Sequence, residues 1–412
     1  MNNHMTSDGY NDKKSIILLF LFFLIFSTYP FVFNLIIPLP PITFLMFITL
    51  VGSILIKGNG EIGLPKEIVY VAFAQLMGTL LSMFATGDIG YYKQILYIIW
   101  VLLYIDLLNK YGIKDYLFYY HRILTVVAVL GVISFVLSAV FGARTYLEYT
   151  NMDGRPGWLA YFTFTNINMG SFIRYSGIFD EPGAMAFWGM IALIINKLYV
   201  HDKIIEVPLI VCLLFTFSIA YIIQLALYLF FFYGLNAKFK KTIVVIIVIV
   251  VSVLLAYHYL DKDSHVYMLT FGRLGIGSSY NLLEDSSRAE LTKLAKNVFE
   301  SSPMFGIGTT AFYGGVYMAD NPYETLAKDG IIGSFFIYLP LVVALFRARF
   351  NLEILFAVVI LMVGYLQRPF HMNFLHYSML YIFLFIVWEM TSISVNTNNS
   401  EVNEIQHNHC DL

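Results

Sequence analysis

The sequence predicts an all-α integral membrane protein that crosses the bilayer about twelve times. Of its 412 residues, 59% are hydrophobic and only 13% are charged, and its mean hydropathy is +0.72. A soluble domain usually carries about 25% charged residues. Long apolar runs recur along the whole chain, and in lipid a helix is the economical way to satisfy backbone polar groups. These observations favour one multi-span domain, residues 1–391, over two or three soluble domains.

The individual spans are expected wherever an apolar run approaches the length of a membrane-crossing helix, which is about 20 residues. The first run follows Lys13 and Lys14 and lacks a small-x-small cleavage site, so it is expected to remain as an uncleaved span. The twelve runs are 15–36, 40–56, 68–86, 92–109, 123–142, 183–200, 205–219, 220–235, 242–260, 330–347, 352–367 and 374–391.

Orientation follows from lysine and arginine, which favour the cytoplasmic side. A pair of short spans in 205–235, bent near Thr216–Tyr221, keeps the basic cluster at 238–241 inside, whereas one long span would place it outside. Both termini then face the cytoplasm, including the polar and disordered tail 392–412. The other residues expected at the cytoplasm are Lys13, Lys14, Lys57, Lys66, Lys110, Lys114, Arg122, Lys197, Lys203, Arg347 and Arg349.

Several function classes are disfavoured by composition and motifs. A net charge of −2 provides no basic field for nucleic acid, and Cys212 and Cys410 lie in settings too different for a disulfide framework or a thiolate metal site. No His/Cys/carboxylate spacing marks a metal site, and neither a P-loop nor a Gly-x-Ser-x-Gly elbow occurs. We therefore expect no metal and no cofactor. Asp106, inside a span, is expected to pair with Lys110 four residues later.

The predicted topology places two large loops, 143–182 and 261–329, on the external face. The first contains Arg155, Arg174 and Glu181 among several aromatic residues. Arginines suit phosphates, carboxylates suit hydroxyls, and aromatic rings suit the apolar faces of sugars. The alternative is structural, with Asp180 or Glu181 capping the next helix and Arg174 pairing with one of them.

The second loop contains a predicted amphipathic helix. Ser287 and Glu290 form a capping box, and apolar residues follow at helical spacing until Pro303 ends the helix. The helix is expected from about 288 to 301. Arg288 lies in its first turn, where free N–H groups favour an anion and a guanidinium matches a phosphate. The alternative is an arginine that snorkels at the membrane interface.

Two motifs occur in these loops. The first loop contains Arg174…Gly177-Ile-Phe-Asp-Glu-Pro182, and the second contains Arg288, an amphipathic helix, Phe305-Gly-Ile-Gly308 and Asn321-Pro-Tyr323. The first motif is similar to the arginine…glycine-x-phenylalanine-x-glutamate-proline signature of O-antigen polymerases of the Wzy type. The second resembles the last large external loop of the wider O-antigen polymerase and ligase superfamily. In ligases a histidine usually precedes this asparagine, and here Asp320 stands in its place.

The resemblance implies a glycosyltransferase-type polysaccharide polymerase in the bacterial inner membrane. Its substrate would be an oligosaccharide linked to undecaprenyl pyrophosphate, and a chain-length regulator is an expected partner. Arg174 and Arg288 would bind the pyrophosphate. Glu181, Asp320 and Asn321 would orient sugar hydroxyls or accept the proton. The other candidate substrate-binding residues are Tyr323, Arg155 and His371, and His371 is also a candidate base.

Two alternatives remain. An O-antigen ligase would transfer glycan to lipid A–core, and the missing histidine argues against it. A transporter or flippase would perform no chemistry, and it would be expected to bury charges within its spans and to contain repeated halves. The charges of this chain instead concentrate in two loops, which favours an enzyme.

Overall fold

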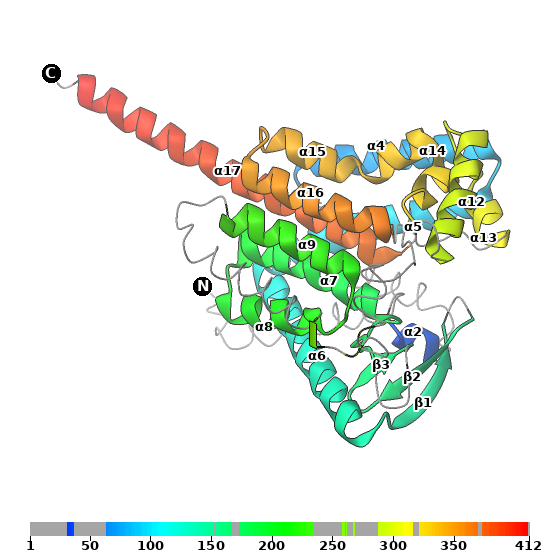
Figure 1. Cartoon of the computed structure of the whole chain (residues 1–412). Helices are drawn as coiled ribbons and strands as arrows, with labels where there is room; N and C mark the ends of the chain where they lie inside the picture. The colour runs from blue at the N-terminus through cyan, green and yellow to red at the C-terminus, as the bar shows by residue number, and fades with distance from the viewer. Residues whose placement is uncertain are drawn as a thin grey trace, which may run out of the picture.

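The structure, a computed structural model, describes residues 31–36, 63–151, 154–166, 168, 173–234, 258–259, 261, 267, 287–315, 321–369 and 373–410, without the side chains of 111, 287, 288, 367 and 393–410. The described part is mostly helical (Figure 1). It contains six helices long and apolar enough to cross a membrane, which supports a helical membrane protein. These are Lys66–Thr86, Ile89–Lys110, Ile113–Phe141, Pro182–Val200, Glu324–Arg347 and Phe374–Ser392.

Most predicted spans correspond to helices. The predicted runs 15–36, 40–56 and 242–260 lie largely outside the described residues, so the count of twelve spans stays a prediction. The helices are α2 (Phe33–Ile36), α4 (Lys66–Thr86), α5 (Tyr92–Tyr111), α6 (Ile113–Phe141), α7 (Pro182–Ile195), α8 (Lys203–Leu214), α9 (Ile219–Leu229), α12 (Ser287–Ser301), α13 (Thr309–Gly314), α14 (Glu324–Ile337), α15 (Leu339–Arg347), α16 (Leu352–Gln367) and α17 (Phe374–Cys410), with the short helical turns η1 (Ile89–Tyr91), η2 (Asn196–Val200) and η3 (Phe230–Gly234).

The stretch 205–235 folds as two helices, as the charge pattern predicted. α8 ends at Leu214 and α9 begins at Ile219. The Ser218 side chain accepts a hydrogen bond from the Tyr221 amide, and the Tyr221 hydroxyl donates to the Ile210 carbonyl at 3.0 Å. Because residue 221 reaches back to residue 210, α9 folds against α8 instead of continuing it.

α7 forms the buried centre of the bundle. All of its residues are buried, and it packs against α8, α9 and α16. Its sequence is apolar on every side, which is typical of a helix surrounded by other helices. At Gly189, an added Cβ would lie 2.5 Å from the Leu213 side chain, so α8 approaches α7 closely at this point.

A three-stranded antiparallel sheet occupies the first predicted loop, and the prediction of an all-α fold was wrong there. The strands are β1 (Thr145–Thr150), β2 (Pro156–Ala160) and β3 (Thr163–Thr165), in the order β1-β2-β3. Tyr149 pairs with Gly157, and its ring covers the glycine so closely that a Cβ there would lie 2.3 Å away. This cross-strand contact fills the surface that glycine leaves empty.

α14 is interrupted in its middle, and another loop fills the interruption. Gly330 has φ 65° and ψ −172°, which breaks the helix. The amides of Ile307 and Gly308 donate to the Ala327 and Lys328 carbonyls before the break. The amides of Ile331 and Ile332, after it, donate to the carbonyls of Pro303 and Met304. The two segments therefore satisfy each other's backbone groups.

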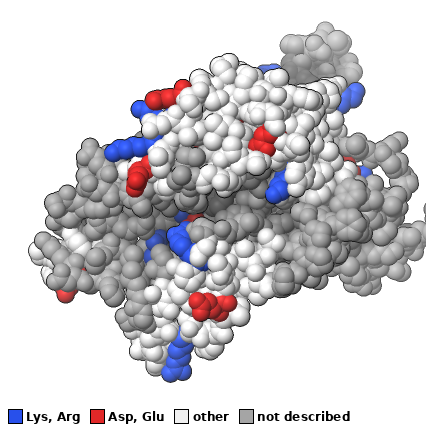
Figure 2. Space-filling view, turned by 90° about the vertical axis from the view of Figure 1, so that its right-hand side faces the viewer, with Lys and Arg blue, Asp and Glu red and all other residues white. Residues whose placement is uncertain are grey.

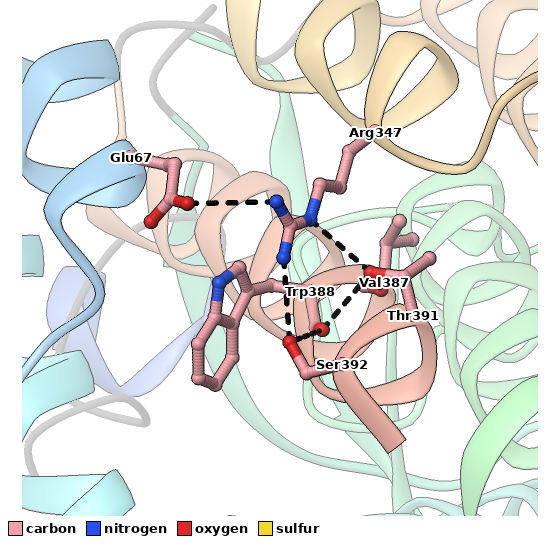
Figure 3. A network of polar contacts seen from close by, with 6 residues as sticks. All are labelled: Glu67, Arg347, Val387, Trp388, Thr391 and Ser392. Carbon is pink, nitrogen blue, oxygen red and sulfur yellow. Dashed lines mark hydrogen bonds and ion pairs between the residues drawn. The ribbon is translucent and has the colours of Figure 1, made fainter. Parts of the chain in front are cut away.

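A polar network ties three helices together at the start of α4 (Figure 3). The Arg347 guanidinium, at the end of α15, contacts the Glu67 carboxylate at 3.5 Å and donates to the Thr391 and Ser392 hydroxyls of α17 at 3.2 and 3.3 Å. Both hydroxyls in turn donate to the Trp388 carbonyl. An arginine with several partners joins α4, α15 and α17 at this end of the bundle.

Beyond this network, α17 continues as a helix to Cys410, where the sequence predicted a disordered tail. No proline or glycine occurs between Thr391 and Cys410, so no residue there interrupts the helix that the apolar half begins.

We expect Gly330→Ala to lower the free energy of unfolding by at least about 2 kcal/mol, because alanine is strained at a positive φ. Its Cβ would also lie 2.4 Å from the Met304 backbone. Gly314→Ala is the matched control, because no atom lies within 4 Å of its added Cβ. Thermal unfolding of both variants in detergent measures the difference. Equal stability of the two variants would contradict the claim that α14 needs its break at Gly330 to pack against the loop 303–308.

Candidate functional site

The glutamate of the first motif lies at one end of the bundle, where several connections meet. In Figure 1, α12, α13 and the strands lie on the side away from the free end of α17. An ion pair between Glu181 and Arg368 joins the start of α7 to the end of α16. Hydrogen bonds join the α4–α5 turn at Asp88 to Thr310 of α13. We call this region, which contains Glu181, Arg368, Asp88 and Thr310, the motif end.

The motif from Arg174 to Glu181 runs along the sheet before it enters α7. The Ser176 amide donates to the Phe164 carbonyl at 2.8 Å, and the Phe164 amide donates to the Gly177 carbonyl at 2.9 Å. Gly177 has a φ of 65°, a conformation that favours glycine. The sheet therefore fixes the path of the motif, and Pro182 begins α7 directly after Glu181.

Arg174 lies at the turn between α8 and α9. Its side chain is buried, and its guanidinium donates three hydrogen bonds, two to the Thr216 carbonyl at 2.9 and 2.7 Å and one to the Phe217 carbonyl at 3.0 Å. Phe217 has a φ of 51°, which is unusual for a residue with a side chain. Arg174 therefore stabilises a strained turn, a contact that the sequence did not predict. Its predicted contact with pyrophosphate stays a prediction.

Glu181 lies between two arginines. One carboxylate oxygen pairs with Arg368 Nη1, and the other lies 3.9 Å from Arg155 Nη2. The side chains of Glu181 and Arg368 are 12% and 7% exposed, whereas Arg155 is 56% exposed. At Gly183, an added Cβ would lie 2.4 Å from the Arg368 guanidinium. Arg368 thus crosses the first turn of α7 directly over Gly183, where the absence of a side chain gives its guanidinium room.

Sequence reasoning missed Arg368. It lies four residues beyond Gly364 in a short connection between predicted spans, and the sequence linked it only to His371. The signal that was available is the pairing of a Pro-Gly helix start, Pro182-Gly183, with a carboxylate directly before it. A glycine in a first helical turn marks a place where another chain segment approaches closely.

Buried polar groups surround this cluster. Asp180 is 6% exposed, and its backbone carbonyl accepts hydrogen bonds from the Tyr149 hydroxyl at 3.5 Å and from the side-chain amide of Asn151 at 3.3 Å. Burial, together with the Asp180 carboxylate, raises the pKa of Tyr149, which stays protonated. The structural alternative for the acidic pair, a side-chain cap on α7, does not apply to Glu181, because its side chain makes no cap hydrogen bond.

The second loop contains the predicted amphipathic helix as α12. Leu294, Val298 and Phe299 pack with Ala295 in a small apolar core, whereas Lys296 and Glu300 are exposed and lie 3.7 Å apart. The Arg288 backbone lies in the first turn of α12, and its side chain is outside the described part of the structure. Asp320 and His371 lie outside it entirely.

Asn321 and Tyr323 lie directly before α14 and stabilise its start. Asn321 is buried, and its side-chain oxygen accepts a hydrogen bond from the Tyr323 amide at 2.9 Å. The centre of the Tyr323 ring lies 6.1 Å from the centre of the Phe299 ring of α12. Both predicted substrate-binding residues therefore have structural contacts, and their contact with a substrate stays a prediction.

The break in α14 buries charged residues that sequence reasoning did not assign. Lys328 and Asp329 are both inaccessible, and their charged atoms lie 3.2 Å apart. The buried Glu324 carboxylate accepts a hydrogen bond from the Tyr313 hydroxyl at 3.1 Å. The Tyr91 hydroxyl of η1 lies 3.4 Å from the Lys328 carbonyl. Lys328-Asp329-Gly330 at the start of an apolar run was the available signal, since charges there need partners.

His376 packs the first turn of α17 against α16 and α14. It is fully buried, and the centre of its ring lies 5.0 Å from that of Tyr365, one turn before Arg368. The centre of its ring also lies 6.4 Å from that of Tyr338, which directly follows α14. The first turn of α17 therefore lies against the end of α16 and the end of α14.

Asp88 holds the second loop onto the bundle. Its two carboxylate oxygens accept hydrogen bonds from the amide and hydroxyl of Thr310, at 2.7 and 2.6 Å, and one also accepts from the Gly90 amide at 2.7 Å. Partial burial raises the pKa of Asp88, and these hydrogen bonds outweigh that effect, so its pKa lies below the ordinary value. Asp88 thus caps both its own turn and α13, whose cap residue, Gly308, has no side chain.

Figure 2 shows the face of the molecule on which the motif end lies. On this face, basic side chains lie between an upper and a lower described part of the molecule, with acidic side chains near them. Among the described residues, no group of three or more His, Cys, Asp or Glu residues is arranged to hold a metal ion. The arrangement can therefore bind an anion with arginines and orient a hydroxyl with a carboxylate.

We expect Asp88→Ala to lower the free energy of unfolding by about 1 kcal/mol at neutral pH, through the loss of two helix caps. Because the pKa of Asp88 is lowered on folding, its contribution is complete above the ordinary value and is lost as the pH falls through the lower folded value. Thermal unfolding measured at neutral pH and below pH 4 checks both parts. A difference between wild type and Asp88→Ala that grows on acidification would contradict this account.

Arg174→Lys should also destabilise the protein, by about 1–3 kcal/mol, because lysine cannot reproduce the fork that binds two carbonyls. Arg144→Lys serves as the control, since Arg144 is an exposed arginine beside the same sheet. Thermal unfolding in detergent gives the comparison. If Arg174→Lys is as stable as wild type, Arg174 does not stabilise the α8–α9 turn.

No protein-family model matches this chain, and no curated protein matches it.

Proposed function

We propose that this protein is an inner-membrane polysaccharide polymerase. It would join oligosaccharide repeat units linked to undecaprenyl pyrophosphate at the external face of the bacterial inner membrane. The observation that supports this proposal best is the Glu181 carboxylate held between Arg155 and Arg368 at the start of a buried helix. Two arginines at the edge of an apolar bundle suit a lipid-linked diphosphate, and a carboxylate suits a sugar hydroxyl.

The proposed topology has about twelve spans with both termini in the cytoplasm. The motif end would then be external, and the Arg347–Glu67 end would be cytoplasmic. Arg347 belongs to the basic residues that the positive-inside rule assigns to the cytoplasm. The lipid tail of the substrate would reach the site sideways from the bilayer, because its diphosphate and the motif end would lie at the same membrane surface.

The proposed reaction replaces one bond at the anomeric carbon of the donor sugar. The oxygen of the acceptor hydroxyl forms the new bond to this carbon while its own bond to hydrogen breaks. The bond between the carbon and the pyrophosphate oxygen breaks, and its electron pair stays on the pyrophosphate. The proton passes to a carboxylate. Fixed positive charge stabilises the leaving group, and it is most effective where water is excluded.

The candidate residues have different parts in this proposal. Arg155 and Arg368 would contact the pyrophosphate, together with Arg288 from the first turn of α12. Glu181 would orient the acceptor hydroxyl and accept its proton, with Asp320 and His371 as the alternative bases. The remaining candidates are Arg174, whose contacts favour a positioning role at the α8–α9 turn, and Asn321 and Tyr323, which would position the second loop.

An O-antigen ligase is the nearest alternative, and a transporter without chemistry is the second. Asp320 in place of the ligase histidine favours the polymerase. The buried pair Lys328–Asp329 is the kind of feature that a transporter would contain, but the pair lies in a break near the end of a span and is tied to a loop. That position suits a folded catalytic end better than a pathway across the membrane.

Deletion of the gene followed by complementation tests the proposal. In the deletion strain, surface glycan should shorten to a single repeat on lipid A–core, and wild type should restore the ladder on a gel. Glu181→Gln and Arg368→Ala should restore about 1% of the wild-type ladder or less, the scale of losing a positioned acid–base group or charge stabiliser. Core without any repeat in the deletion strain would instead indicate a ligase or flippase.

Arg144→Ala is the matched control for this experiment and should restore the full ladder. All variants need equal protein levels and thermal stability, so that a folding defect is separated from a catalytic one. A full ladder from Glu181→Gln would remove Glu181 from the site.

A further inference from the structure

The two arginines that contact Glu181 differ in how firmly they are held. Arg368 is 7% exposed and crosses α7 directly over Gly183, where an added Cβ would lie 2.4 Å from its guanidinium. Arg155 is 56% exposed, and its nitrogen lies 3.9 Å from the carboxylate, beyond hydrogen-bond distance. Because the Arg155 side chain is more than half exposed, solvent screens its ion pair with Glu181 and weakens it. Glu181 is thus fixed on one oxygen and loosely covered on the other.

The position of Arg155 allows it to move. It directly precedes β2, next to the turn that joins β1 to β2, and its backbone carbonyl accepts a hydrogen bond from the Asn151 amide at 2.8 Å. The backbone is therefore held while the long side chain extends into solvent. A side chain on a fixed backbone can exchange partners without any change in the fold.

We propose that Arg155 is an exchangeable arginine, which leaves Glu181 when the pyrophosphate of the substrate binds. This inference rests on the proposed function. A pyrophosphate brings more negative charge than one carboxylate, and its oxygens match the donor fork of a guanidinium. Arg368 stays in place and keeps Glu181 oriented.

The exchange links substrate binding to the state of Glu181. A carboxylate paired with two arginines is a weak proton acceptor, because both positive charges stabilise its ionised form. Departure of Arg155 exposes one carboxylate oxygen to the acceptor hydroxyl. The site would accept a proton only after a pyrophosphate-linked donor has bound, which prevents unproductive binding of the acceptor alone.

A double-mutant cycle on the purified full chain in detergent tests the exchange. The probe is geranylgeranyl pyrophosphate, its affinity is measured by titration calorimetry, and inorganic pyrophosphate and geranylgeranyl monophosphate are the comparison ligands. Arg155→Ala should weaken binding about 10-fold, through the loss of a charge-assisted contact. Glu181→Gln should strengthen binding about 5-fold, because Arg155 is released in advance.

The decisive result is the double variant. With Arg155 absent, Glu181→Gln should change the affinity less than about 2-fold, since there is no arginine left to release. If Glu181→Gln strengthens binding by the same factor with and without Arg155, the carboxylate merely repels the anion and the exchange is wrong. Arg155→Lys should bind between wild type and Arg155→Ala, and Arg144→Ala should bind as wild type does.

The outcomes separate this inference from the proposed function. If the Arg155 and Glu181 substitutions have additive effects on affinity, while wild type still restores the ladder in the deletion strain, only the exchange is overturned. Failure of the wild-type protein to bind the prenyl pyrophosphate, together with a normal ladder in the deletion strain, would overturn both. Tighter binding of the monophosphate than of the pyrophosphate would contradict the assigned substrate class.

Discussion

Every helix end buried in this bundle must find partners for its unpaired backbone groups, and this requirement shapes the motif end. A buried amide or carbonyl without a partner costs about 1–3 kcal/mol. Arg174 satisfies carbonyls at the α8–α9 turn, Asp88 caps α13 from another segment, and the loop 303–308 fills the break in α14. Each of these contacts joins segments far apart in the sequence, so the requirement for backbone partners also brings the charged side chains together.

The same contacts explain why charges can be buried here. Lys328 and Asp329 are adjacent in sequence, and neighbouring residues of a regular helix do not face each other. Their charged atoms nevertheless lie 3.2 Å apart, directly before the break at Gly330. Burying an ion pair usually gives no net stability, so its place between a loop and the α4–α5 turn is better understood as fixing one arrangement of the segments. Rigid surroundings of this kind are what a site needs to hold its groups in position.

The sequence predicted local features well and long-range pairings poorly. Apolar runs located α4 to α9, α14, α16 and α17, charge balance located the α8–α9 turn, and helical spacing located α12. The pair Asp106–Lys110 was also confirmed, at 2.6 Å. The sheet was missed because its alternation spans only a few residues. Arg368 was missed because its partner lies 187 positions earlier. The glycine at the start of α7 indicates that some segment approaches closely there, but it does not indicate which segment.

Arg174 and Glu181 belong to one sequence motif, but they contact different helices. The sequence places it seven residues before Glu181, which suggests that both act on one substrate. In the folded chain the segment between them runs along β3, and the arginine turns toward α8 and α9 while the glutamate meets α16. A strand alternates its side chains between two faces, so a short extended spacing can separate residues as easily as it can gather them. Among the described residues, the arginines that pair with Glu181 are Arg155 and Arg368. Their side chains are 56% and 7% exposed, and this difference is the basis for the proposal that one charge of the cluster can move while the other stays fixed.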